Sequence, residues 1–85
     1  MKPRKLLARI ARGTVTNVAF ADLLSLVEDL GFERRRVSGS HHIFVHPDIP
    51  ELTNLQDANG EAKPYQVRQV WRLIERYDLK LGDTR

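Results

Sequence analysis

Three histidines stand within six residues of one another: His41, His42 and His46. Imidazole binds zinc, and it also accepts and donates protons near neutral pH, so two kinds of chemistry are open to this cluster. The chain has no cysteine, and no nearby acidic pair completes a tetrahedral set of ligands, so we expect no metal and no cofactor. Spacing alone favours ordinary strand histidines with satisfied hydrogen bonds.

Residues 41–46 have the β-branched and aromatic composition of a strand. Alternate residues of a strand share a face. The two sets are His42, Phe44 and His46 on one face and His41, Ile43 and Val45 on the other. Phe44 is the best core anchor, so we expect its face to turn inward and His41 to lie on the outer face, just after the turn at residues 38–40.

A histidine on an open face can take the proton from a ribose 2′-OH and later return one to the leaving oxygen. RNA carries its own nucleophile, so such cleavage needs no metal. Arginines can stabilise the charge that builds on the phosphate, and Arg34, Arg35 and Arg36 stand on the preceding predicted strand. RNA cleavage therefore stays open beside the zinc and purely structural interpretations.

Helical and strand patterns alternate along the chain in an order that predicts its fold class. Apolar residues at helical spacing predict a helix over about residues 20–30, closed by Gly31, and a second one from about Pro64. Three strands are expected between them, at 32–38, 41–46 and 51–56. Short turns favour antiparallel pairing, so we expect an α+β fold with the order α-β-β-β-α. Phe44 should pack against the helix faces that hold Leu24 and Trp71.

The first residues form a basic extension to this domain. Residues 1–12 carry five basic and no acidic side chains, and residues 3–12 can form a helix that docks on the domain or frays. We divide the chain into an extension over 1–16, a domain over 17–81 and a frayed tail over 82–85. Ile43 and Val45 on the outer face need a cover, and we expect the apolar side of the extension or a partner protein to supply it.

Composition and charge narrow the class of protein without choosing a function. The chain has 85 residues, 41% hydrophobic and 29% charged, which suits one folded domain. It has no long apolar run, so we expect no membrane span and a cytoplasmic location. The net charge of +3 fits either a polyanion partner or an ordinary solvated surface. The same two interpretations apply to Lys63, Arg68 and Arg72, which are candidate phosphate contacts.

Several short motifs in this order resemble one known family. They are Leu30-Gly31-Phe32, the run from Arg36 through Gly39-Ser40-His41-His42 to Phe44, and His46-Pro47. Over about residues 20–77 this pattern resembles the HicA toxins, in which a helix ends in Gly-Phe and a Gly-Ser-His turn opens an aromatic strand. Residues 1–16 and the composition of the third strand and last helix depart from the usual pattern.

The resemblance implies a fold like that of double-stranded-RNA-binding domains and a metal-independent endoribonuclease, an mRNA interferase, that acts on mRNA. It implies a cognate HicB-like antitoxin as partner, and a homodimer is left open. The catalytic histidine of the family carries over to His41. Gly39, Ser40, His42 and His46 receive supporting roles, and the candidate RNA contacts are Arg34, Arg36, Lys63, Arg68 and Arg72. A non-catalytic RNA-binding module and a protein-interaction domain remain the alternatives.

Overall fold

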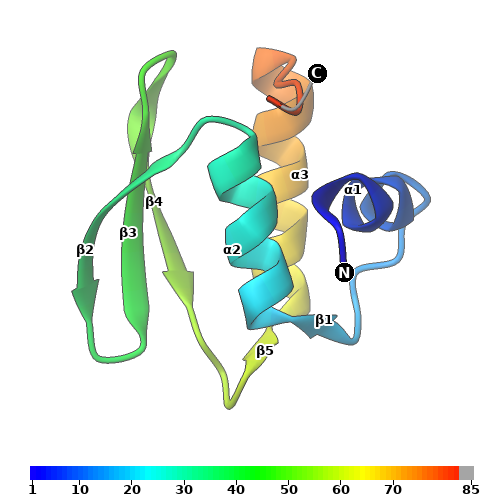
Figure 1. The fold of residues 1–85 in the computed structure, drawn as a ribbon, viewed down its shortest axis with the longest axis horizontal. Coiled ribbons are helices and arrows are strands. Elements are labelled where there is room, and N and C mark those ends of the chain that lie inside the picture. The colour runs from blue at the N-terminus through cyan, green and yellow to red at the C-terminus, as the bar shows by residue number, and fades with distance from the viewer. Residues whose placement is uncertain (83–85) are drawn as a thin grey trace.

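The computed structural model describes residues 1–82 of the chain. Its elements in chain order are α1 (Pro3–Ala11), β1 (Val18–Ala19), α2 (Phe20–Asp29), β2 (Glu33–Ser38), β3 (His41–His46), β4 (Ile49–Gln56), β5 (Glu61–Ala62) and α3 (Pro64–Tyr77). The main sheet has the strand order β2-β3-β4, and both pairs are antiparallel. The α+β fold expected from the sequence is therefore confirmed, including the helices α2 and α3 on one face of the sheet (Figure 1).

Two short strands tie the starts of the two central helices together. β1 pairs with β5, with Val18 opposite Ala62, and the N–H of Phe20 donates to the carbonyl of Gly60 at 2.9 Å. β1 runs directly into α2, and β5 is followed by α3 after a single residue. The strand pair therefore brings the first turns of α2 and α3 to the same end of the molecule. The sequence did not predict this second sheet, because strands of two residues carry no periodicity.

The helix α2 ends on the glycine that the sequence predicts as its cap. Gly31 has φ of +104°, its N–H donates to the carbonyl of Glu28, and the N–H of Phe32 reaches back to the carbonyl of Val27, both at 3.1 Å. This pair of bonds satisfies carbonyls that a helix end leaves without partners. The chain then turns sharply into β2, and Phe32 enters the core.

The structure also leaves no space for a side chain at position 31. A Cβ atom at this position would lie 2.9 Å from Nε2 of His46, so we expect Gly31→Ala to destabilise the fold through both positive φ and this clash. Gly13 ends α1 in the same way, with φ of +93° and open space at its Cβ position. Gly13→Ala should therefore show only the backbone penalty, roughly 1–2 kcal/mol, and Gly31→Ala about 1–3 kcal/mol more. Urea unfolding measures both, and equal losses would contradict the clash.

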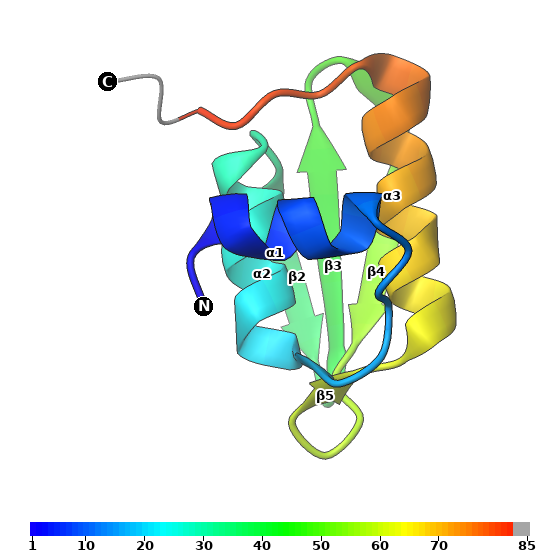
Figure 2. The ribbon, with the colours of Figure 1, turned by 90° about the vertical axis from the view of Figure 1, so that its right-hand side faces the viewer.

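The helix α1 forms a third layer on the far side of α2 and α3 from the sheet (Figures 1 and 2). Its Leu6 and Ile10 are buried, at 0% and 2% exposure. The expected cover of Ile43 and Val45 by this segment is therefore wrong. The apolar side of α1 is buried against α2 and α3 instead. Both of these helices also carry apolar side chains on the face turned away from the sheet.

The position of α1 also explains two differences between the core of the structure and the core predicted from the sequence. Leu26 is fully buried and Leu24 is only half-buried, because α2 lies between two layers and its apolar face is wider than a single stripe. Trp71 is half-buried and lines a hollow with Leu7 and Ala8 of α1. Phe44 is fully buried in the core, and Leu24 and Trp71 are partly buried residues packed against that same core.

The end of the described chain returns to α2. Gly82, the first residue of the tail that the sequence predicts to fray, donates its N–H to the carbonyl of Asp29 at 2.8 Å. The rest of that expected tail, residues 83–85, lies outside the described residues. Within residues 1–82, no helix has both the length and the apolar character needed to cross a membrane.

Candidate active site

His41 begins β3 directly after a two-residue turn. Ser38 pairs with His41 across the turn, and Gly39 takes φ of +58°, in the left-handed region. The carbonyl of Ser40 accepts the N–H of Asp57 at 2.9 Å, which fixes the turn to the loop that follows β4. His41 itself is exposed. The hairpin thus holds the backbone of this histidine while its ring stays open to solvent.

The outer face of the sheet carries His41 with an apolar strip. Ile43 and Val45 share this face and are half-buried, and Leu52 on β4 is 68% exposed. Figure 1 shows that α2 and α3 lie on the opposite face of the sheet and that α1 lies beyond them. No element of residues 1–82 therefore covers the face that holds His41.

A β-bulge decides which arginines share this face. Arg34 pairs with Phe44 and Arg36 pairs with Ile43, so Arg35 is an extra residue between two neighbouring pairs. Paired residues share a face, which puts Arg36 on the side of His41 and Arg34 on the side of Phe44. Arg35 and Arg36 together line a hollow with Ile43 and Leu52. Simple alternation groups Arg34 with Arg36, and the candidate RNA contacts taken from the sequence included these two but not Arg35.

The ring of His41 has a hydrogen-bond partner that the sequence also did not reveal. Its Nδ1 lies 3.3 Å from Oδ1 of Asn54 on β4. Asn54 pairs with Ile43, so it stands diagonally across from His41 on the same face. The contact joins residues 13 positions apart, and it depends on the register of β3 against β4.

The other two histidines face the helices. His42 is half-buried with its ring against Phe20, at 5.0 Å between centroids and in an edge-on arrangement. His46 is buried, its Nε2 lies 3.1 Å from the carbonyl of Leu30, and its Nδ1 accepts the N–H of Asp48 at 3.0 Å. Both ring nitrogens of His46 are therefore used, with Nε2 as the donor and the ring neutral. This geometry holds the end of α2 against β3 and places His46 away from solvent.

The three basic residues named on or beside α3 lie in different places. Lys63 precedes the helix and is exposed, and its carbonyl accepts the N–H of Gln66, whose side chain bonds to β4 at Gln56. Because Gln56 is the pairing partner of His41, Lys63 lies at the His41 end of the molecule. Arg68 is exposed on α3. Arg72 lies about 12 Å further along the helix than Pro64, at 1.5 Å per residue.

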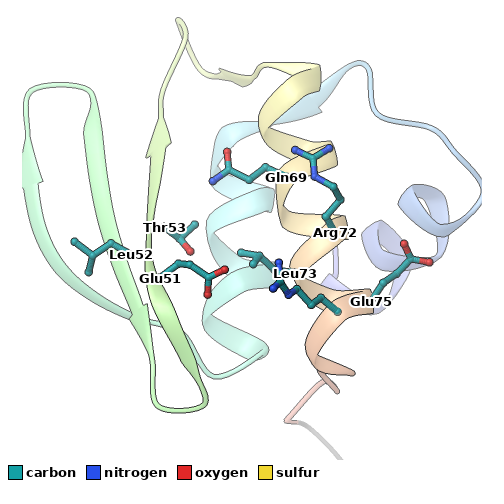
Figure 3. A pocket seen from close by; sticks show the side chains of 8 residues that line it. Glu51, Leu52, Thr53, Gln69, Arg72, Leu73 and Glu75 are labelled. Atoms are coloured by element: carbon teal, nitrogen blue, oxygen red, sulfur yellow. The ribbon is translucent and has the colours of Figure 1, made fainter.

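Arg72 belongs to a groove between β4 and α3 (Figure 3), not to the outer face of the sheet. The other residues lining this groove are Glu51, Leu52, Thr53, Gln69, Leu73, Glu75 and Arg76. The hydroxyl of Tyr77 donates to Glu51 at 2.8 Å. That bond lowers the pKa of the Glu51 carboxyl and raises the pKa of the Tyr77 hydroxyl. Glu51 therefore stays ionised. The groove as a whole holds two carboxyl side chains, Glu51 and Glu75, beside the two arginines Arg72 and Arg76.

The donor side chains do not gather into a metal site. Within residues 1–82, no group of three histidine, cysteine, aspartate or glutamate side chains is placed so that it could hold a metal ion. The chemistry available on the outer face is that of an exposed imidazole with a hydrogen-bonded Nδ1 and of two arginines on the same face of the sheet. This set can move a proton and stabilise an anion.

One of three comparisons with known proteins gave a match, and it is to a family model. Comparison with curated proteins and with solved structures gave no match. The model of a family described as the HicA toxin of bacterial toxin-antitoxin matches residues 20–75, from the start of α2 almost to the end of α3. The matched residues contain the whole three-stranded sheet and the Gly39-Ser40-His41 turn. The chain therefore belongs to the HicA toxin family.

Proposed function

We propose that this toxin-family protein is an endoribonuclease that cleaves mRNA and uses His41 as its proton-transfer group. The observation that carries the proposal is the exposed His41 on a sheet face that no other described element covers, with Arg35 and Arg36 on that same face. An RNA strand can reach this face from solvent. The same ring in the position of His46, buried and with both nitrogens bonded, would be closed to substrate.

The proposed reaction uses the ribose as the nucleophile. His41 takes the proton from a 2′-OH, and the 2′-oxygen attacks the adjacent phosphorus while the bond to the 5′-oxygen breaks. The imidazolium returns its proton to the leaving 5′-oxygen. The products are a 2′,3′-cyclic phosphate and a free 5′-OH, and no further reactant enters. The guanidinium groups on the same face stabilise the negative charge that grows on the phosphoryl oxygens.

The bulge in β2 gives a sharp prediction for the arginines. Arg35→Ala and Arg36→Ala should each lower kcat/KM for RNA by roughly 10-fold or more, because each removes a charge from the face of His41. Arg34→Ala removes the same charge from an exposed residue of the same strand and should have a smaller effect, which makes it a matched control. Cleavage kinetics on one oligonucleotide measure all three. An Arg34→Ala loss equal to the other two would contradict the placement of the active face.

We propose a HicB-like antitoxin as the partner that covers this face. Ile43, Val45 and Leu52 form an apolar strip beside His41, and a protein that buries this strip also blocks access to the ring. The extension at residues 1–12 cannot supply that cover, because it packs behind the helices. We also propose that Lys63 and Arg68, which lie outside the sheet face, contact phosphates of the RNA.

The proposal is tested by incubating the purified chain with a mixed mRNA sample in buffer that contains EDTA. We expect RNA fragments with a 5′-OH, and growth arrest when the chain is expressed alone. RNA binding that weakens with salt and produces no fragments would replace the nuclease with a non-catalytic RNA-binding module. The absence of both binding and cleavage would leave a protein-interaction domain.

A further inference from the structure

Asn54 stands beside the proposed catalytic ring with an atom that can only accept a hydrogen bond. Its Oδ1 faces Nδ1 of His41 at 3.3 Å, and an amide oxygen has no proton to give. The contact is therefore a hydrogen bond only when Nδ1 of His41 carries the proton. In the neutral ring, the second nitrogen, Nε2, then has a free lone pair.

We propose that Asn54 is a positioning residue that fixes the tautomer of His41, so that Nε2 is the atom that takes the proton from RNA. This inference rests on the proposed ribonuclease function. It identifies Nε2 of His41 as the single reacting atom. It also gives β4 a role in the chemistry, in addition to that of the Gly-Ser-His turn. The partner of a catalytic histidine acts in the same way in other hydrolases, where it orients the ring and selects its tautomer.

Asn54 can hold the ring only if its own strand is held, and Gln66 supplies that support. Gln66 lies in the first turn of α3 and is 5% exposed. Its Nε2 donates to the carbonyl of Asn54 at 3.2 Å, and its Oε1 accepts the N–H of Gln56 at 2.7 Å. The amide side chain thus pairs with the free edge of β4 as another strand would, and it satisfies two backbone groups on either side of Leu55.

A continuous chain of contacts therefore runs from the start of α3 to the ring of His41. Gln66 fixes the backbone of Asn54, and the side chain of Asn54 fixes the imidazole. The amide of Asn54 carries no charge, so it accepts from Nδ1–H both before and after Nε2 gains its proton. A carboxylate in the same place would favour the imidazolium and make the ring a poorer proton donor at a given pH.

The tautomer can be measured without RNA. Long-range ¹⁵N–¹H correlation spectra of His41 report it at a pH at which the ring is neutral. We expect Nδ1 protonated in the wild type. In Asn54→Ala the ring should return to the Nε2–H form that free imidazole side chains prefer, and kcat should fall roughly 10- to 100-fold, the range seen for residues that orient a histidine at metal sites. KM should change little, since Asn54 does not bind the phosphate.

Two further variants separate positioning from a general structural role. Asn54→Asp should keep the Nδ1–H form and move the acid limb of the pH–rate profile to higher pH. Gln66→Ala should lower kcat, whereas Gln69→Ala, one turn along the same helix and without a bond to β4, should not. Circular dichroism establishes that each variant is folded.

An unprotonated Nδ1 in the wild type would overturn the inference, as would an Asn54→Ala protein with unchanged tautomer and kcat. The two proposals fail separately. A wild-type protein that does not cut RNA removes the ribonuclease function whatever its tautomer. A protein that cuts RNA with His41 in the Nε2–H form removes only the role of Asn54.

Discussion

Replacing His41 with alanine is expected to lower the rate of RNA cleavage by about 10²- to 10⁴-fold, the usual contribution of a general acid–base group. The ring is exposed, so its removal should change the free energy of unfolding by no more than roughly 0.5 kcal/mol. Cells that express His41→Ala should therefore grow normally although they accumulate folded protein. Single-turnover cleavage and urea unfolding measure the two effects independently.

Ser38→Ala is the matched control for this substitution. Ser38 is exposed, stands opposite His41 in the sheet and lies on the same face, but it has no group that titrates near neutral pH. Its replacement should leave the cleavage rate within a small factor of the wild type. If His41→Ala cut RNA as fast as Ser38→Ala, the proton transfer would have to be reassigned to another residue.

The sequence predicted the features of this site that depend on local patterns. The strand over residues 41–46 was predicted with the bounds that the structure has. Strand alternation also correctly separated the exposed His41 from the buried Phe44 and His46. Gly31 was predicted as a helix cap because positive φ has a strong residue preference. Each of these inferences needs only the residue types within one turn or one strand.

The features that sequence reasoning missed depend on contacts between distant segments. The bulge at Arg35 arises from the pairing of two strands, and alternation along one strand cannot reveal it. The bond between His41 and Asn54 requires the register of β3 against β4. The short pairing of β1 with β5 has too few residues to leave a pattern. None of these three features can be predicted from local sequence patterns, because each depends on how distant segments pair in the tertiary structure.

The position of α1 was missed for a different reason. Its apolar side is small, so the sequence allowed it to dock on either face of the domain or to fray. The structure shows that α2 and α3 present a second apolar surface on the side away from the sheet, where Leu6 and Ile10 are buried. The charge of residues 1–12 gave no indication of this. The helix α1 also lies outside the residues that match the HicA family, 20–75.

Leu6→Ala is expected to cause a large loss of stability, about 2–5 kcal/mol, as other buried leucines do. Leu6 is fully buried and belongs to the same hydrophobic core as residues of α2 and α3. A small domain is commonly stable by only about 5–15 kcal/mol, so this loss is a large part of the total. Chemical denaturation of the purified protein measures it.

The control for Leu6→Ala is Lys5→Ala, the neighbouring exposed position of the same helix. This change should alter stability by no more than roughly 0.5 kcal/mol. Similar small effects for both variants would show that α1 is not docked on the domain in solution. A large effect of Leu6→Ala alone would make residues 1–12 a part of the folded toxin domain, beyond the matched region.

The central proposal, that His41 on the open sheet face activates a ribose 2′-OH, is tested most directly with a single modified substrate. An RNA oligonucleotide that the wild type cuts at one mapped bond is compared, in EDTA, with a copy that carries one 2′-deoxynucleotide on the 5′ side of that bond. We expect the all-ribose strand to yield a 2′,3′-cyclic phosphate and the deoxy copy to remain intact there. Cutting of the deoxy copy at the same bond and rate would contradict the proposed chemistry.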